Sequence, residues 1–457
     1  MRKYSFFAIV IAVLFAACGQ QKKDDGWKSL FNGKDLTGWK QLNGKAPYTV
    51  EDGVIVGTSV TNTPNSFLAT EDLYSDFVLE LEVMVDDAVN SGIQFRSNSK
   101  PDYHKGRVHG YQCELDPSYD RAWTAGIYDE ARRGWLYPGS LSPKAKPAFK
   151  HNDWNKIRIE CIGNTLRTWL NGVPVSYLID DETSEGFIAL QVHGIGNNKD
   201  KEGKQIKWKN IRIKTENITP SPVEEGVFVR NMIENTVSDA EKAQGWKSLW
   251  DTKTTNGWRG AGKEKFPEGG WKIENGELIV LESGGGESVN GGDIVTMDEY
   301  GAFEFQCEFK YTEGANSGVK YFVTEAYKVK NASSIGLEFQ ILDNEKHPDA
   351  KKGAVGNRQI GSLYDLIPAR QHGSVRARPN KWNHCRVVVR PDNVVQHWLN
   401  GYKVVEYERG SAIYDALVAR SKYANWEKFG MAETGHILLQ DHGNEVHYRS
   451  IKIKELK

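Results

Sequence analysis

Two histidines occupy equivalent places in a chain that carries 11 of them. Each follows a leucine, a glutamine and one further residue, and each precedes a glycine; they are His193 and His442. A neutral imidazole is well suited to take up a proton near pH 7, which makes both histidines candidate general bases. Strand alternation places Gln191 on the face of His193 and Gln440 on the face of His442. Because duplication alone can preserve a structural residue, a structural role is the alternative.

A second polar strand lies upstream of each histidine and carries one amide and one carboxylate on the same face. In the first case the pair is Gln112 and Glu114, and in the second it is Glu338 and Gln340, in swapped order. Buried carboxylates are rare unless they are paired or functional, so both glutamates are candidate functional groups. A solvated edge strand is the alternative interpretation.

A Tyr-Asp pair follows each of these strands. Tyr128 and Asp129 precede Trp135 in the first half, and Tyr364 and Asp365 stand in the second. Such a segment offers hydrogen bonds and an aromatic face, which suit a sugar ligand. Arg96 is a further candidate contact in the first half, but Phe322 occupies its place in the second, so a charged contact is missing there.

These residues are positioned by two copies of one domain. Six blocks recur in the same order: Gly26–Leu30 as Gly245–Leu249, Trp39 as Trp258, Asn90–Gly92 as Asn316–Gly318, Trp154-Asn155 as Trp382-Asn383, Trp169–Gly172 as Trp398–Gly401, and the two histidine runs. This period is far longer than that of a solenoid repeat, so the sequence indicates a tandem domain duplication.

Each copy is expected to be all-β. The runs Phe77–Val83 and Phe303–Phe309 alternate apolar and polar residues, which is typical of half-buried strands. The Asn-Gly pairs at 171–172 and 400–401 predict hairpin turns. Many short strands predict a two-sheet sandwich or jelly roll in each copy.

The expected boundaries are 26–215 for the first domain, 216–240 for a linker and 241–457 for the second domain. A capping box at Ser238–Glu241 predicts a short helix in the linker. The second copy carries an extra segment over 410–434, where Ile413, Leu417 and Tyr423 are expected to form one face of a helix that covers or flanks the second site.

The N-terminus resembles an export signal. Arg2 and Lys3 precede an apolar run that ends at Cys18, so 1–18 is a candidate lipoprotein signal peptide with Cys18 as the acylated residue, and 19–25 is a polar tether. We expect an exported outer-membrane lipoprotein, periplasmic or surface-exposed, that meets the membrane only through its lipid. An ordinary signal peptide is the alternative.

Composition narrows the classes of partner. The 59 basic and 60 acidic residues leave a net charge of −1, which argues against nucleic-acid binding through a broad basic surface. The 14 Trp and 19 Tyr suit a β core and also a sugar cleft. Cys113, Cys161, Cys307 and Cys385 lack zinc-site spacing and fall at non-equivalent places in the two copies, so lone buried thiols are favoured over a Cys113–Cys161 or Cys307–Cys385 disulfide.

Taken together, the ordered blocks resemble the bacterial 3-keto-glycoside 1,2-lyase and 3-keto-2-hydroxy-glucal hydratase domain family, also called 3-keto-disaccharide hydrolases. The matching pieces are Gly26–Trp39, Glu51–Val54, Asn90–Ile93, Glu338–Asp343, Gly361–Tyr364 and the two Leu-Gln-x-His-Gly runs. The resemblance implies two concanavalin-A-like jelly rolls, each with a concave sugar cleft.

The resemblance also implies a chemistry, in which the ketone at C3 acidifies the C2 proton. It implies His193 and His442 as bases, Glu114 and Glu338 as acids or metal ligands, and Tyr128 and Tyr364 as orienting groups. Arg96, Gln191 or a bound divalent metal ion would stabilise the enolate. The remaining candidate substrate contacts are Gln112, Gln340, Gln440, Asp129, Trp135, Asp343 and Asp365.

Two alternatives stay open. A conventional glycosidase needs two carboxylates, but Glu114 with Asp116 in the first copy and Glu338 with Asp343 in the second are not equivalent pairs. A carbohydrate-binding lipoprotein without turnover is the other class. Convergence of the histidine, the carboxylate and the tyrosine on one cavity would favour the lyase interpretation.

Overall fold

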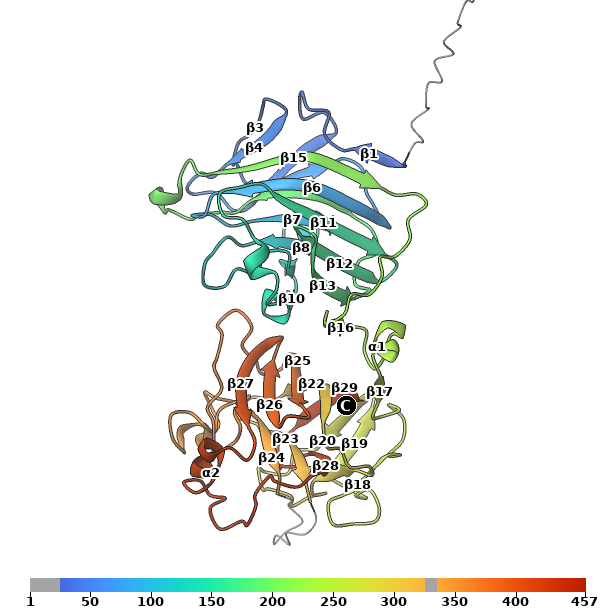
Figure 1. Cartoon of the computed structure of the whole chain (residues 1–457), viewed down its shortest axis with the longest axis vertical. Helices are drawn as coiled ribbons and strands as arrows, with labels where there is room; N and C mark the ends of the chain where they lie inside the picture. The colour runs from blue at the N-terminus through green and yellow to red at the C-terminus, as the bar shows by residue number, and fades with distance from the viewer. Residues whose placement is uncertain (1–24, 325–334) are drawn as a thin grey trace, which may run out of the picture.

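The computed structural model describes residues 25–324 and 335–457, and these form two β-sandwiches stacked end to end (Figure 1). Within the described residues the first sandwich has one nine-stranded and one seven-stranded sheet. The larger runs in the order β16 (Val229–Asn231), β13 (Val173–Ile179), β12 (Thr165–Leu170), β11 (Asn155–Ile162), β6 (Phe77–Val85), β15 (Gln205–Lys214), β4 (Val54–Thr58) and β3 (Tyr48–Glu51), with β1 (Trp27–Ser29) paired to β15. The smaller runs β10 (Gly134–Tyr137), β9 (Ile127–Glu130), β8 (His109–Leu115), β7 (Ser91–Asn98), β14 (Phe187–Val192), β5 (Ser66–Thr70) and β2 (Trp39–Asn43).

The second sandwich repeats this plan with an eight-stranded and a five-stranded sheet among the described residues. The larger sheet runs β19 (Trp271–Glu274), β20 (Glu277–Val280), β29 (Val446–Glu455), β22 (Phe303–Tyr311), β25 (Asn383–Val389), β26 (Val394–Leu399) and β27 (Tyr402–Glu408), with β17 (Trp246–Ser248) paired to β29. The smaller sheet runs β18 (Trp258–Gly260), β21 (Ile294–Thr296), β28 (His436–Leu439), β23 (Asn316–Val323) and β24 (Leu337–Leu342). The expected all-β architecture of two tandem jelly rolls is confirmed.

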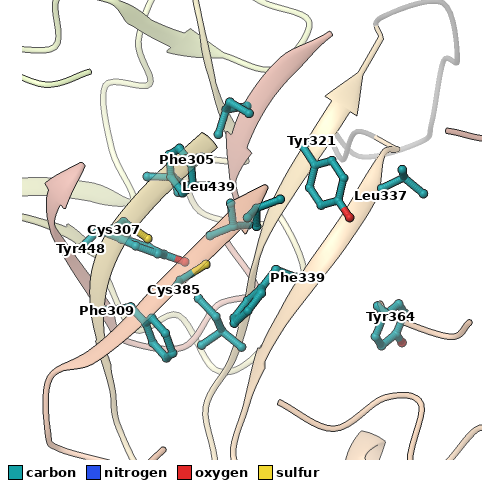
Figure 2. Packing of buried hydrophobic residues seen from close by; sticks show 14 of the residues in the cluster. Phe305, Cys307, Phe309, Tyr321, Leu337, Phe339, Tyr364, Cys385, Leu439 and Tyr448 are labelled. Carbon is teal, nitrogen blue, oxygen red and sulfur yellow. The ribbon is translucent and has the colours of Figure 1, made fainter. Parts of the chain in front are cut away.

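Alternation along the strands explains both cores. Phe305, Cys307 and Phe309 point from β22 into the second sandwich, where they meet Phe339 and Leu439 from the facing sheet (Figure 2). Apolar side chains that leave water on one face of each sheet supply most of the stabilisation of such a sandwich. The intervening polar residues are therefore left on the outer faces, and one of these faces carries the candidate site.

The two Asn-Gly pairs form the hairpins that the sequence predicts. Asn171 and Gly172 join β12 to β13, with φ of 50° and 82°, and Asn400 and Gly401 join β26 to β27, with φ of 50° and 80°. Both central residues of each turn lie in the left-handed region, which asparagine tolerates and glycine prefers.

The linker is more ordered than a simple spacer. Residues 229–231 form β16, which pairs in parallel with β13 and so belongs to the first sandwich, contrary to the expected linker over 216–240. Helix α1 (Asp239–Ala243) begins at Ser238 with the predicted capping box and runs past residue 240. Local sequence patterns give no sign of this strand, because a parallel pairing joins partners far apart in the chain.

The extra segment of the second domain contains helix α2 (Ala412–Val418). Leu417 and Tyr423 pack against the core as expected, but Ile413 is 75% exposed. Tyr414 is the buried residue of that turn, and its hydroxyl donates to the carbonyl of Phe429 at 2.6 Å. The expected helix face was therefore displaced by one residue.

Cys113, Cys161, Cys307 and Cys385 are free and buried, as favoured from their positions. Cys18 and the rest of 1–24 lie outside the described residues, so export and acylation stay predictions. No helix in the described ranges is long and apolar enough to cross a membrane.

Candidate functional site

In each domain, the repeated Asn-Ser-Gly block determines how side chains lie on the outer face of the smaller sheet. Ser91 donates its hydroxyl to the carbonyl of Gln191 at 2.7 Å, which fastens β7 to β14. Gly92 lies opposite Glu114 in the register, and a Cβ at this glycine would collide with the side chain of Gln112. The missing side chain therefore lets Gln112 lie across the strand.

The second domain has the same arrangement of a serine hydrogen bond and a glycine without a side chain. Ser317 donates to the carbonyl of Gln440 at 2.7 Å, and a Cβ at Gly318 would collide with the carboxyl group of Glu338. The residue that crosses the glycine is thus an amide in the first domain and an acid in the second. This is the structural meaning of the swapped order seen in the sequence.

Glu114 sits at the centre of a polar network in the first domain. Its two carboxyl oxygens accept from Asn90 Nδ2 at 2.7 Å and from Gln112 Nε2 at 2.8 Å. Gln112 Oε1 in turn accepts from Gln191 Nε2 at 3.0 Å. Burial outweighs these bonds and the nearby Arg121 charge, and it raises the pKa of Glu114 to about 7. A carboxyl group in this state can donate a proton near neutral pH.

His193 lies one residue beyond the end of β14 and lines the same cavity as Gln112, Glu114 and Tyr128. Its Nδ1 is 2.8 Å from the carbonyl oxygen of Gly194, which can only accept, so Nδ1 carries the proton. Nε2 of the neutral ring is then the atom that is able to take up a proton. Desolvation lowers the pKa of His193 below its ordinary value, which keeps the ring neutral at pH 7.

Aromatic rings form one wall of the first site. Trp135 contacts Tyr128 edge to face, with ring centroids 5.3 Å apart, and Trp123 in the same way at 4.7 Å. The guanidinium of Arg121 lies 5.3 Å from each indole ring and 2.6 Å from Asp116. Desolvation raises the pKa of Tyr128, so its hydroxyl remains protonated.

The second site is lined by Glu338, Tyr364 and His442, together with two lysines, in a cavity of about 270 Å³. Burial raises the pKa of Glu338 to about 7, against the opposing effect of Lys320 and Lys422. Lys320 stands two residues beyond Gly318 on the face of Glu338, and Lys422 comes from the extra segment, with its Nζ 4.2 Å from the ring centre of Tyr364. The expectation that this segment flanks the second site is borne out in position.

Several polar atoms around the second cavity lack a hydrogen-bond partner among the described residues. They are Asn316 Oδ1, Gln340 Oε1, Gln440 Oε1 and His442 Nδ1, and all four residues line the cavity. Buried polar atoms are rarely left unpaired unless a ligand or water completes them. A hydroxyl-rich molecule such as a sugar fits this set, because each hydroxyl both donates and accepts.

Tyr364 and Asp365 hold the rim of the second site. The Tyr364 hydroxyl donates to Asp349 at 2.7 Å, and desolvation followed by this bond raises the pKa of Tyr364 well above its ordinary value. Asp365 accepts from Arg358 Nε at 2.6 Å and from the backbone N–H of Lys422 at 2.8 Å. Asp365 therefore positions the lysine segment rather than lining the cavity.

Four further predicted residues, namely Arg96, Asp129, Asp343 and Gln191, do not line a cavity. Arg96 is buried, and its guanidinium donates to the carbonyls of Ser75 and Gly163 and pairs with Asp76, so it joins β7 of the smaller sheet to turns at the strand ends of the larger sheet. The charged contact that was expected from it is therefore absent from the first cavity.

Asp129 and Asp343 are occupied elsewhere. Asp129 pairs with Arg132 and Arg133 at 2.7 and 2.6 Å. Asp343 accepts from the backbone N–H groups of Glu345 and Lys346 in its own turn and from that of Gly314, and these bonds lower its pKa against the effect of burial. Gln191 supports Gln112 from behind, whereas Trp135 and Gln112 line the first cavity directly and Gln340 and Gln440 line the second.

The sequence reasoning missed Arg121, Lys320, Lys422 and Glu287, all of which line a cavity. Lys320 could have been predicted, because it follows Gly318 by two residues and so lies on the same face of a strand that the sequence indicates. The other three come from loops whose approach to the sheet follows no period. Among the described residues no group of three or more histidine, cysteine, aspartate and glutamate side chains is placed to hold a metal ion.

Comparison with known proteins adds three findings. A family model described as the 3-keto-alpha-glucoside-1,2-lyase-like domain matches residues 26–214 and again residues 245–454. A 3-keto-disaccharide hydrolase of Bacteroides thetaiotaomicron is 36% identical over 236 residues, which are 47% of this chain and 79% of that protein. A crystal structure of a proposed glycosyl hydrolase from Parabacteroides distasonis matches 49% of this chain and all of its own, with 28% identity and a TM-score of 0.43.

Proposed function

The chain belongs to the 3-keto-alpha-glucoside-1,2-lyase-like domain family, with two copies of the domain, and from this premise we propose that it cleaves 3-keto-glycosides by elimination across C1 and C2. The observation that carries the proposal is the convergence of a histidine, a high-pKa glutamic acid and a tyrosine on one cavity in each domain. The same three residue types meet twice, although the glutamate occupies a different strand position in each copy.

The first step is removal of the C2 proton. In the first domain Nε2 of neutral His193 takes this proton, and the electron pair of the C2–H bond passes to the C3 ketone as an enolate. His442 has the corresponding role in the second domain. The lowered pKa of His193 favours the neutral form that the step needs.

The second step expels the aglycone. The enolate re-forms the C3 carbonyl, a C1=C2 double bond forms, and the C1–O bond to the aglycone breaks with its electrons going to oxygen. Glu114 or Glu338 in its protonated form donates a proton to that oxygen, which balances the proton taken at C2. The products are a 3-keto-2-hydroxy-glucal and the free aglycone.

Charge on the enolate needs a partner in the cavity. In the second domain the ammonium groups of Lys320 and Lys422 stand beside Glu338 and would oppose the negative oxygen. In the first domain Gln112 and the guanidinium of Arg121 are the corresponding groups. Addition of water across the C1=C2 bond of the product, with the same acid and base in reversed roles, would complete a net hydrolysis.

The pH dependence of the reaction follows from the two pKa shifts in the first domain. The base must be neutral, so kcat/KM should rise through the lowered pKa of His193, below 6.5, and the acid must be protonated, so it should fall as pH passes about 7. We expect a bell-shaped profile for the protein in which His442 is replaced by asparagine, so that only the first domain works. A profile that keeps rising above pH 8 would contradict Glu114 as the acid.

Turnover of matched substrates tests the function itself. A 3-keto-glucoside should be consumed with release of its aglycone, whereas the unoxidised parent glucoside should be stable, because without the ketone its C2 proton is not acidic. Chromatography of the released aglycone measures both. Cleavage of the parent would favour a conventional glycosidase, for which Glu287 and Glu338 in the second cavity are the available carboxylates. Binding without turnover of either would favour a carbohydrate-binding protein.

A further inference from the structure

The cavity of the first domain does not end at its own sheet. Its volume is about 1480 Å³, more than five times that of the second cavity, and its walls include residues of the second domain. Gly373–Arg376, Arg378 and Lys381–His384 of the second domain line it together with Glu114 and His193 of the first. The side of the site that faces the second domain is therefore open to a group larger than one sugar ring.

Arg230 lies in this interdomain part. It belongs to β16, the strand that adds the linker to the first sandwich between the two bodies (Figure 1). The residue is only 7% exposed, its Nη1 has no hydrogen-bond partner among the described residues, and its Nε contacts only the sulfur of Met232 at 3.2 Å.

No carboxylate in the described part of the chain lies within ion-pair distance of Arg230. The acids whose charges it senses are occupied by other arginines: Glu308 accepts from Arg449 at 2.7 Å, and Asp180 pairs with Arg133. Burial without a counter-charge lowers the pKa of Arg230 below the ordinary arginine value, though a guanidinium remains charged at physiological pH. A buried guanidinium without an anion is unfavourable on its own, so the site is complete only when an anion is supplied.

The hairpin of the second domain comes close to Arg230. A Cβ on Gly401 would lie 2.8 Å from Cγ of Pro138 and 3.3 Å from Nη1 of Arg230, so any larger residue at this turn would crowd the guanidinium. Ser140 of the first domain donates to the carbonyl of Gly401 at 2.7 Å, which holds the hairpin in place. Arg376 and Arg378 line the same cavity, and neither forms an ion pair with a described residue.

We propose that the interdomain part of the first cavity binds an oxyanion, a carboxylate or sulfate on the aglycone of the glycoside whose reacting ring lies at His193 and Glu114. The planar guanidinium of Arg230 would receive it through paired N–H bonds. The substrate class is then an acidic glycoside, recognised by both domains at once. The assignment to an aglycone rests on the proposed function, whereas the oxyanion site itself does not.

Binding of unoxidised ligands tests the site without any need for turnover. By calorimetry, 4-carboxyphenyl glucoside should bind the intact protein about tenfold more tightly than phenyl glucoside, as expected for one charge-assisted contact. Arg230→Met should abolish this preference. Arg212→Met, which removes an arginine of equal charge that is paired with Glu80 and lines neither cavity, should leave it unchanged.

Two further measurements keep the outcomes distinct. Because Arg230 has no carboxylate partner, Arg230→Met should not lower the melting temperature in the absence of ligand, and a marked fall would show that the arginine is structural and overturn the proposal. Sodium sulfate alone is the second probe. Stabilisation by sulfate that needs Arg230, without any preference for the carboxylated glucoside, would overturn the aglycone assignment.

The kinetic readout separates this proposal from the proposed function. On matched 3-keto-glucosides, Arg230→Met should raise KM for the carboxyphenyl substrate alone, with kcat unchanged, because the contact lies away from the reacting bond. If neither 3-keto substrate is turned over, the proposed function fails while the binding result stands. If the carboxylate gives no advantage in binding or in KM, the oxyanion site fails while the lyase reaction stands.

Discussion

Replacement of both His193 and His442 with asparagine is expected to lower kcat/KM on a 3-keto-glucoside by about 10²- to 10⁴-fold, the usual contribution of a general base. Asparagine can keep a hydrogen bond like that from His193 to the carbonyl of Gly194, but it cannot take up a proton. The loss should appear in kcat rather than in KM, since the proton moves only in the transition state.

The single variants assign the working domain. If one domain carries the reaction, one single variant should lose nearly all activity and the other almost none; if both work, each should retain the activity of the partner domain. His104→Asn is the matched control, because His104 is exposed, lines neither cavity and has a positive φ that asparagine tolerates. Full activity in the double variant would remove histidine from the mechanism.

Glu338→Gln is expected to change the pH dependence of stability by about 3 kcal/mol, since the folded pKa of about 7 exceeds the ordinary glutamate value of 4.5. A raised folded pKa means that the folded state holds its proton longer than the unfolded state. This contribution to stability is complete below pH 4.5 and is lost as the pH rises through about 7. Glutamine resembles the protonated acid at every pH and so escapes the loss.

Urea unfolding at pH 5 and pH 8 measures this effect. The difference in free energy of unfolding between variant and wild type should move in favour of the variant by about 2.5 kcal/mol between the two pH values, because the contribution is not yet complete at pH 5. The exposed Glu345→Gln serves as the control for a charge change in the same domain. An equal difference at both pH values would show that Glu338 is ionised in the folded protein throughout. The same variant should lose the activity of the second domain. The substitution that favours stability at high pH therefore removes catalysis at the same carboxyl group.

Local patterns predicted the framework well. Strand alternation, the Asn-Gly hairpins, the capping box at Ser238 and the internal repeat each depend on residues close together in the chain or on direct comparison of the two halves. Gln112 and Glu338 were placed on the correct face because the period of a strand is two and requires no knowledge of its partners.

The residues whose surroundings were not predicted from the sequence have one feature in common, which is that their contacts come from distant parts of the chain. The contacts of Arg96 are fixed by Asp76 and by the turn at Gly163, which lie 20 and 67 residues away. Lys422 reaches Tyr364 from an insertion, and Arg121 reaches the indole rings from a loop. Such approaches depend on tertiary packing, and a residue type alone does not distinguish an arginine in a cleft from one that joins two sheets.

The parallel pairing of β16 with β13 determines where the two domains can be separated. A cut near residue 216 would leave β13 as a bare edge strand, whose free N–H and C=O groups invite pairing with another molecule and aggregation. It would also remove Ser221 and Glu224, whose oxygens accept hydrogen bonds from Arg167 on the outer face of the first sandwich. A soluble first-domain fragment should therefore extend through Asn231, and a second-domain fragment should begin before the helix cap at Ser238.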